Sequence, residues 1–150
     1  MITVRITEFV IDPEALLAML REEVAPDAGA ITSFTGVMRA EGGNANALTL
    51  QHYPGYTESE VSKIAERARS RFGLLGLVVQ HRVGEMRPGE TIVFVAAASA
   101  HRREAFEACD YMMDYLKSAA PFWKREDGPE GARWIEPTSR DLADRKRWED

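Results

Sequence analysis

One stretch, residues 99–126, constrains the fold more than any other part of the chain. It reads SAHRREAFEACDYMMDYLKSAAPFWKRE. Apolar side chains recur in it at helical spacing, and the opposite arc is polar and acidic, which predicts a long amphipathic helix at about 100–120. The apolar stripe consists of Phe106, Cys109, Met113, Leu116 and Ala120. Ser99 is predicted to cap the start of this helix and Pro121 to end it, so that an aromatic and basic turn follows.

Basic side chains stand at both ends of this predicted helix. Lys117 lies on the border of the apolar stripe, whereas His101 and Arg102 lie at the start and project toward the apolar side. A lysine on such a border either extends its ammonium into solvent or occupies a cavity where partial loss of water changes its chemistry. With a rise of 1.5 Å per residue, Arg102 and Lys117 are roughly 22 Å apart along one helix. A site that uses both residues therefore requires a second copy of the chain.

Composition excludes several classes of protein. A chain of 150 residues, 45% hydrophobic and 29% charged, suits one soluble globular domain, which we expect to span residues 1–150. The net charge of −5 argues against a general surface for nucleic acid or for an anionic membrane. No apolar run approaches the length of a membrane span. The single cysteine, Cys109, lies on the apolar stripe and suits a reducing compartment, so we expect a cytoplasmic protein.

The remaining segments alternate between strand and helix patterns. Strands are predicted at 2–6, 30–38, 47–53, 77–83, 91–98 and 133–136, and further helices at 12–25 and 57–72. Asp12 and Pro13 start the first of these helices, and Thr57 and Glu60 are predicted to form a capping box at the second. The apolar run 91–98 is expected in the centre of the sheet. A turn at 86–90 favours an α+β domain with a mixed or antiparallel sheet over a doubly wound parallel one.

The C-terminal region carries fewer signals. Residues 41–46 and 127–131 are rich in glycine and are expected to be loops. The tail is interpreted as a solvated segment that docks through Trp148.

The chemistry of a candidate site follows from what the chain lacks and what remains. It contains no glycine-rich phosphate loop, no nucleophile elbow and no cluster with metal-ligand spacing; His52, His81 and His101 are isolated in the sequence. The remaining candidates are Arg39, His101, Arg102, Lys117, Lys124 and Arg125. Arginine and lysine in that number favour binding of a phosphate or a carboxylate. The residues alone therefore indicate an anion-binding site near the helix ends.

Five segments, taken in order, resemble the large, catalytic subunit of molybdopterin synthase. They are Phe34-Thr-Gly36 with Arg39, Leu50 to Gly55 (LQHYPG), His81 to Glu85 (HRVGE), Ser99 to Arg102 (SAHR) and Met113 to Glu126 (MDYLKSAAPFWKRE). The resemblance extends from about Ala28 to the terminal Arg-Trp. It implies a fold of the α/β-hammerhead type and a reaction without a metal or another cofactor.

The resemblance also implies a reaction and its partners. Cyclic pyranopterin monophosphate receives two sulfur atoms and becomes molybdopterin, a dithiolene. The sulfur comes from a small ubiquitin-like carrier whose C-terminal Gly-Gly ends in a thiocarboxylate. Two copies of the large subunit form a homodimer, and one carrier binds at each outer end to give a heterotetramer.

The same resemblance assigns roles to individual residues. Lys117 matches an essential lysine near the thiocarboxylate, and Lys124 matches a second lysine. His101 and Arg102 match a pair that reaches the substrate from the neighbouring subunit. The other substrate-binding matches are Val37, Met38, Arg39, Arg125 and Glu126.

Two other interpretations of the same residues stay open at this point. A non-catalytic module that binds a pterin or another anion could use the same basic cluster. A structural interaction protein could instead use Phe122 and Trp123 as a docking surface.

Overall fold

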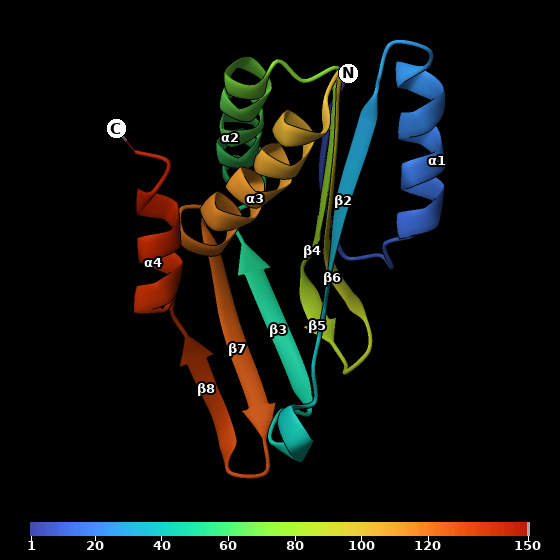
Figure 1. The fold of residues 1–150 in the computed structure, drawn as a ribbon. Coiled ribbons are helices and arrows are strands. Elements are labelled where there is room, and N and C mark those ends of the chain that lie inside the picture. Colours follow the sequence, from blue (N-terminus) through green and yellow to red (C-terminus); the bar gives the residue numbers. More distant parts are fainter. Residues whose placement is uncertain (150) are drawn as a thin grey trace.

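The structure is a computed structural model that describes residues 1–149. It contains two four-stranded sheets (Figure 1). The strands are β1 (Ile2–Thr7), β2 (Ala30–Val37), β3 (Ala47–His52), β4 (Gly76–Arg82), β5 (Gly84–Met86), β6 (Thr91–Ser99), β7 (Phe122–Gly128) and β8 (Gly131–Ile135). The helices are α1 (Pro13–Val24), α2 (Tyr56–Phe72), α3 (Arg102–Ser118) and α4 (Ser139–Lys146), with a short 3₁₀ helix η1 (Glu41–Gly43) in the segment expected to be a loop. The expected α+β class is confirmed.

The first sheet has the order β1-β4-β6-β2 and is covered by helices on both faces. Only β1 and β4 pair in parallel, and β6 is an inner strand, as its apolar run predicts. Val78 and Ala96 pack toward α1, whereas Leu77, Val79 and Val95 pack toward α2 and α3. This alternation follows from the two-residue period of a strand, and it buries the middle of the sheet completely.

The second sheet has the order β5-β3-β7-β8 and extends away from the helices of the first sheet (Figure 1). A separate apolar cluster, made by Met38, Ala45, Leu50, Val83 and Met86, joins the two sheets. The segment Arg82–Gly84 leads directly from β4 in the first sheet to β5 in the second. The apolar cluster and this segment therefore connect the second sheet, which contains β7, to the core of the first sheet.

The long helix α3 is confirmed, but it is shorter than predicted. Its N-cap is His101, because the Ser99 hydroxyl donates to the His101 carbonyl oxygen and does not cap the first turn. The buried face includes Cys109 and Leu116 of the predicted stripe, but it is centred on the neighbouring Ala105, Ala108 and Met112. Phe106 is consequently 57% exposed. Small side chains at the actual contact face allow α3 to lie close to α2 and the first sheet.

The start of α2 also differs from the predicted capping box. The backbone N–H of Gly55 donates to the Glu58 carboxylate at 3.2 Å, so Glu58 and not Glu60 caps the first turn. Thr57 has another use: its hydroxyl accepts from the Tyr53 N–H at 2.9 Å and donates to the Pro121 carbonyl oxygen at 3.1 Å. Thr57 thus links the start of α2 to the residue that precedes β7.

The segment after Pro121 is a strand, although the sequence predicted an aromatic turn. Residues Phe122–Gly128 pair with β3 on one side and with β8 on the other. The predicted strand at 133–136 is found as β8, and the predicted solvated tail contains α4. Docking through Trp148 is confirmed, since its ring packs against Phe72 and Tyr111.

The link between α2 and Pro121 yields a stability prediction. We expect Thr57→Val to lower the free energy of unfolding by about 1–2 kcal/mol, because the change leaves a partly buried N–H and a partly buried carbonyl without their partner. Thr57→Ser keeps the hydroxyl and serves as the control. Denaturant unfolding measures both. A valine variant as stable as the wild-type protein would show that the two hydrogen bonds contribute nothing net.

Candidate functional site

A cavity of about 400 Å³ brings together three of the basic residues singled out in the sequence, and we call it the lysine cavity. Lys117 comes from the last turn of α3, Lys124 from β7, and Arg39 from the segment after β2. The remaining lining residues are Glu41, Leu116, Ala120, Phe122, Ile135, Glu136, Pro137, Thr138 and Asp141. One side of the cavity is therefore apolar and the other carries charges of both signs.

The strand β7 places Lys124 by the alternation of its side chains. Lys124 is opposite Leu50 of β3 and Ile135 of β8, and it lies on the same face as Phe122. Its neighbours Trp123 and Arg125 point to the other face of the second sheet. Because Leu50 is fully buried, the aliphatic part of Lys124 emerges from an apolar base.

The electrostatics of the cavity centre on Lys124. Burial, and to a smaller extent the positive charge of Lys117, lower the pKa of its amino group to about 8, whereas Asp141 opposes both effects. The sequence left open whether the ammonium of Lys117 is in solvent or in a cavity; in the structure Lys117 is exposed although it lines the cavity, whereas Lys124 is partly buried. A buried amine beside a second amine can lose or gain a proton near physiological pH, which is a property of functional lysines.

His81 forms part of the support behind the cavity. Its ring stacks on Phe122 with a centroid separation of 4.2 Å, and its Nδ1 lies 2.8 Å from the Arg82 carbonyl oxygen. Burial lowers the pKa of His81 to about 4. The imidazole is therefore neutral, and the base of the cavity adds no positive charge to that of the two lysines.

Other predicted site residues lie elsewhere in a single chain. His101 and Arg102 are exposed and line a separate cavity of about 490 Å³ at the start of α3, not the apolar side. Arg125 forms an ion pair with Asp127 at 3.5 Å, and Glu126 forms one with Arg133 at 3.1 Å.

The two residues before Arg39 have different environments. Val37 is 48% exposed at the edge of the first sheet, whereas Met38 is buried between the two sheets. Neither lines the lysine cavity.

Sequence reasoning missed the acidic part of the cavity. Asp141 belongs to the segment that was interpreted as a solvated tail, and Glu136 ends the predicted strand at 133–136, to which no site role was given. A signal for Asp141 was present, because Thr138 and Asp141 have the spacing of a capping box, and the structure contains that box at the start of α4.

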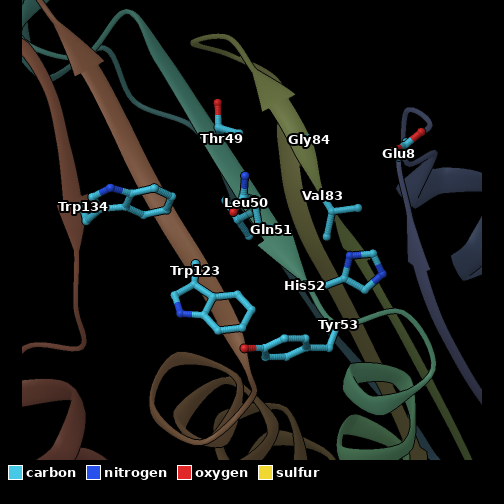
Figure 2. A pocket seen from close by; sticks show the side chains of 10 residues that line it. All are labelled: Glu8, Thr49, Leu50, Gln51, His52, Tyr53, Val83, Gly84, Trp123 and Trp134. Carbon is cyan, nitrogen blue, oxygen red and sulfur yellow. The ribbon is translucent and has the colours of Figure 1, made fainter.

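A larger cleft, of about 870 Å³, lies on the other face of the second sheet (Figure 2). Trp123, Trp134 and Tyr53 line it together with Gln51, and the rings of Tyr53 and Trp123 meet edge to face at 4.2 Å. None of the residues assigned to catalysis or substrate binding in the sequence analysis lines this cleft. Its lining includes the carboxylate of Glu8 but no arginine or lysine, so it lacks the cations that hold a phosphate.

Cysteine, metal and membrane chemistry can be considered briefly. Cys109 is buried in the core, and burial raises the pKa of its thiol to about 12, which leaves it unreactive at neutral pH. Within residues 1–149, no group of three or more His, Cys, Asp or Glu side chains could hold a metal ion. None of the helices in this part of the chain combines the length and the apolar character needed to cross a membrane.

Comparison with known proteins identifies the family. A family model described as "MoaE protein" matches residues 6–119. The molybdopterin synthase catalytic subunit of Caulobacter vibrioides is 54% identical over 149 residues, which cover 97% of each chain. The chain therefore belongs to the MoaE protein family, and the resemblance found in its motifs is confirmed.

Two solved structures agree with this assignment. The molybdopterin biosynthesis MoaE protein from Burkholderia ambifaria has a TM-score of 0.85 at 41% identity and covers 100% of this chain and 99% of its own. A complex of subunits 1 and 2 of the molybdopterin-converting factor from Helicobacter pylori has a TM-score of 0.71 at 23% identity, with coverage of 93% and 91%. At that identity the second likeness concerns the fold alone.

The buried position of Lys124 makes a prediction about stability and pH. Folding lowers the pKa of Lys124 from 10.5 to about 8, so between these pH values the unfolded chain holds this proton more tightly than the folded chain. The contribution of this group to the free energy of unfolding therefore rises as pH rises through that window. We expect Lys124→Met to be more stable than the wild-type protein at neutral pH, with a difference that shrinks through the window.

Thermal or denaturant unfolding at several pH values measures this difference. The exposed Lys63 provides the matched control, because Lys63→Met changes an equal charge that keeps its water. A Lys124→Met variant that is less stable at neutral pH, or a difference independent of pH, would mean that burial does not penalise this ammonium.

Proposed function

We propose that this chain is the catalytic subunit of a molybdopterin synthase, a sulfurtransferase of molybdenum cofactor biosynthesis that works in the cytoplasm. It transfers two sulfur atoms from the thiocarboxylated C-terminus of a small ubiquitin-like carrier to cyclic pyranopterin monophosphate. The observation that carries this proposal is the lysine cavity, where Lys117, Lys124 and Arg39 converge. Membership of the MoaE family and the printed names of the similar proteins support it.

The cavity has the chemistry to hold the substrate. The cyclic phosphate of the substrate is an anion, which Arg39 and the ammonium of Lys124 can neutralise and orient. Arg39 is exposed, with its side chain 3.8 Å from the Glu41 carboxylate, so it can turn toward a ligand at little cost. The apolar side of the cavity, which includes Leu116 and Phe122, suits the flat part of a pterin.

Each sulfur transfer requires charge to be managed at the same place. In the first transfer the thiocarboxylate sulfur attacks a side-chain carbon of the substrate. A carbon–sulfur bond forms while the bond from that carbon to an oxygen of the cyclic phosphate breaks, so the ring opens to a phosphate monoester anion and the carrier stays attached as a thioester. In the second transfer the sulfur replaces the oxygen on the neighbouring side-chain carbon, which leaves as water. Water then hydrolyses the thioester, so the carrier departs with a carboxylate and the sulfur stays on the substrate. Negative charge develops on oxygen in these steps, and Lys117 is the exposed ammonium at the cavity that can stabilise it.

The active site is shared by two copies of the chain. Arg102 and Lys117 belong to one uninterrupted helix, so they are roughly 22 Å apart along its axis, yet both match substrate-site residues. A two-fold dimer solves this conflict by bringing Arg102 of one copy to the lysine cavity of the other. With one carrier bound to each copy, the assembly is a heterotetramer.

The free edge of β2 is the surface that suits this dimer. β2 is the last strand of the first sheet, and Phe34 and Val37 on it are 43% and 48% exposed. An exposed edge of this kind pairs readily with another strand. Antiparallel pairing of two β2 strands about Phe34 brings Arg39 of one copy near Gly29 of the other, whose N–H donates to the Ser99 carbonyl oxygen at 3.0 Å. His101 and Arg102 follow immediately after Ser99.

Lys117→Ala tests the catalytic assignment. We expect sulfur transfer to fall by about a hundredfold or more, as when one strong transition-state interaction is removed. The fold should remain intact, because Lys117 is exposed and its truncation opens no core. Conversion of the substrate to the dithiolene by thiocarboxylated carrier measures the loss, with Lys63→Ala as the control. Near-normal turnover in a folded Lys117→Ala protein would remove Lys117 from catalysis.

Subunit complementation tests the shared site. Arg102→Ala and Lys117→Ala should each be nearly inactive alone. When the two are unfolded together and refolded as an equal mixture, about half of the dimers are mixed, and each mixed dimer has one intact site and one doubly altered site. Activity should therefore recover to roughly a quarter of the wild-type value. Mixed dimers that form without any recovery would mean that each site is built from one chain.

A further inference from the structure

The C-terminal segment supplies one wall of the lysine cavity. Glu136, Pro137 and Thr138 follow β8 and lead into α4, and Asp141 lies in the first turn of that helix. The other walls come from α3 and β7, which carry the two lysines. The catalytic surface therefore includes a part of the chain that is distant in sequence from Arg39 and α3.

A reciprocal cap holds the Asp141 carboxylate in place. The Thr138 hydroxyl accepts from the Asp141 N–H at 3.1 Å, and Oδ2 of Asp141 accepts from the Thr138 N–H at 2.9 Å. The cap fixes the side chain at the start of α4, where the helix dipole also favours a negative charge. The carboxylate thus lines the cavity with a defined orientation.

A second set of contacts, which we call the C-terminal clasp, holds α4 against α3. The indole N–H of Trp148 donates to Asp114 at 2.6 Å, and the Arg147 guanidinium donates to the same oxygen at 2.7 Å. Arg147 also pairs with Asp110 at 2.6 Å, and Arg71 of α2 donates to the Trp148 carbonyl oxygen at 2.8 Å. Asp114 lies one turn before Lys117 on α3, so the clasp fastens α4 to the helix that carries one of the lysines.

We infer that Asp141 is a positioning residue that serves as the counter-charge of the Lys124 amino group, and that the C-terminal clasp keeps it at the cavity. This inference rests on the proposed role of Lys124 in substrate binding and sulfur transfer. Asp141 keeps a proton on Lys124, so the cavity presents an ammonium to the phosphate of the substrate. Without the carboxylate, Lys124 loses its proton at lower pH, so less of it is an ammonium at a given pH.

Titratable and charged groups from the neighbouring elements line or support the cavity that contains Lys124. They are Lys117 on α3, Asp141 on α4, His81 on β4, Arg39 and Glu41 after β2, and Glu136 after β8. His81 is neutral, and burial together with Lys117 opposes protonation of Lys124. Asp141 raises the pKa of Lys124 and so opposes both influences. Its removal should favour the uncharged amine.

Two variants separate the charge of Asp141 from its structural role. Asp141→Asn removes the charge but keeps an oxygen that can accept from the Thr138 N–H. Thr138→Ala removes the hydroxyl of the cap but keeps the carboxylate. Competitive acylation of the lysines in the full-length chain at a series of pH values, followed by mass spectrometry, gives the midpoint of Lys124 titration relative to the exposed Lys63.

In Asp141→Asn the midpoint should fall below the wild-type value of about 8, and the reactivity of Lys124 at neutral pH should rise on the order of threefold or more, equivalent to half a pKa unit. Trp148→Ala should shift the midpoint in the same direction, and Thr138→Ala should leave it near the wild-type value. An unchanged midpoint in folded Asp141→Asn, or an equal shift in Thr138→Ala, would overturn the inference.

The pH dependence of sulfur transfer separates this inference from the proposed function. If both hold, the limb of the profile that follows Lys124 moves to lower pH in Asp141→Asn together with the labelling midpoint. Suppose that in Asp141→Asn the labelling midpoint of Lys124 falls but the pH profile of sulfur transfer does not move. Asp141 would then still be the counter-charge of Lys124, but Lys124 would take no part in the reaction. This result would count against the proposed function and not against the pairing of the two residues.

Discussion

A partly buried lysine ammonium is the charge around which the site is arranged. Lys124 emerges from the apolar base formed by Leu50, and Lys117 adds a second positive charge nearby. Such an arrangement is unfavourable for the folded state unless something of opposite charge is near. Asp141 supplies part of that charge within the chain, and an anionic substrate supplies more. Binding of an anion in the cavity should therefore stabilise the folded protein.

The alternation of side chains along β7 divides the second sheet into two different surfaces. Phe122 and Lys124 face the lysine cavity, whereas Trp123 faces the larger cleft, which Trp134 also lines (Figure 2). The larger cleft is the more apolar of the two, but it lacks the paired cations that a phosphate requires. For this reason the smaller cavity is the better candidate for the chemistry, and the size of a cavity alone would have indicated the wrong face.

Much of this arrangement could be predicted from the sequence, and the exceptions have physical reasons. The helix α3 was evident because its apolar period is long, and the distance between Arg102 and Lys117 followed from helix geometry alone. The start of α3 was predicted too early, because the Ser99 hydroxyl donates to the His101 carbonyl oxygen and does not cap the first turn. The strand β7 was missed because it owes its conformation to pairing with β3, more than 70 residues earlier. The cap formed by Thr138 and Asp141 has a local signal, but the place of Asp141 at the cavity depends on contacts of Trp148 and Arg147 with Asp114, more than 30 residues earlier, and the sequence does not identify that partner.

The most direct test of the central claim is a crystal structure of the protein with cyclic pyranopterin monophosphate bound. The account predicts that the phosphate lies in the lysine cavity, within hydrogen-bonding distance of Lys124 and Arg39, and that Arg102 of a second copy reaches the same molecule. A substrate found in the larger cleft lined by Trp123 and Trp134, or a substrate held by residues of one chain only, would contradict this claim.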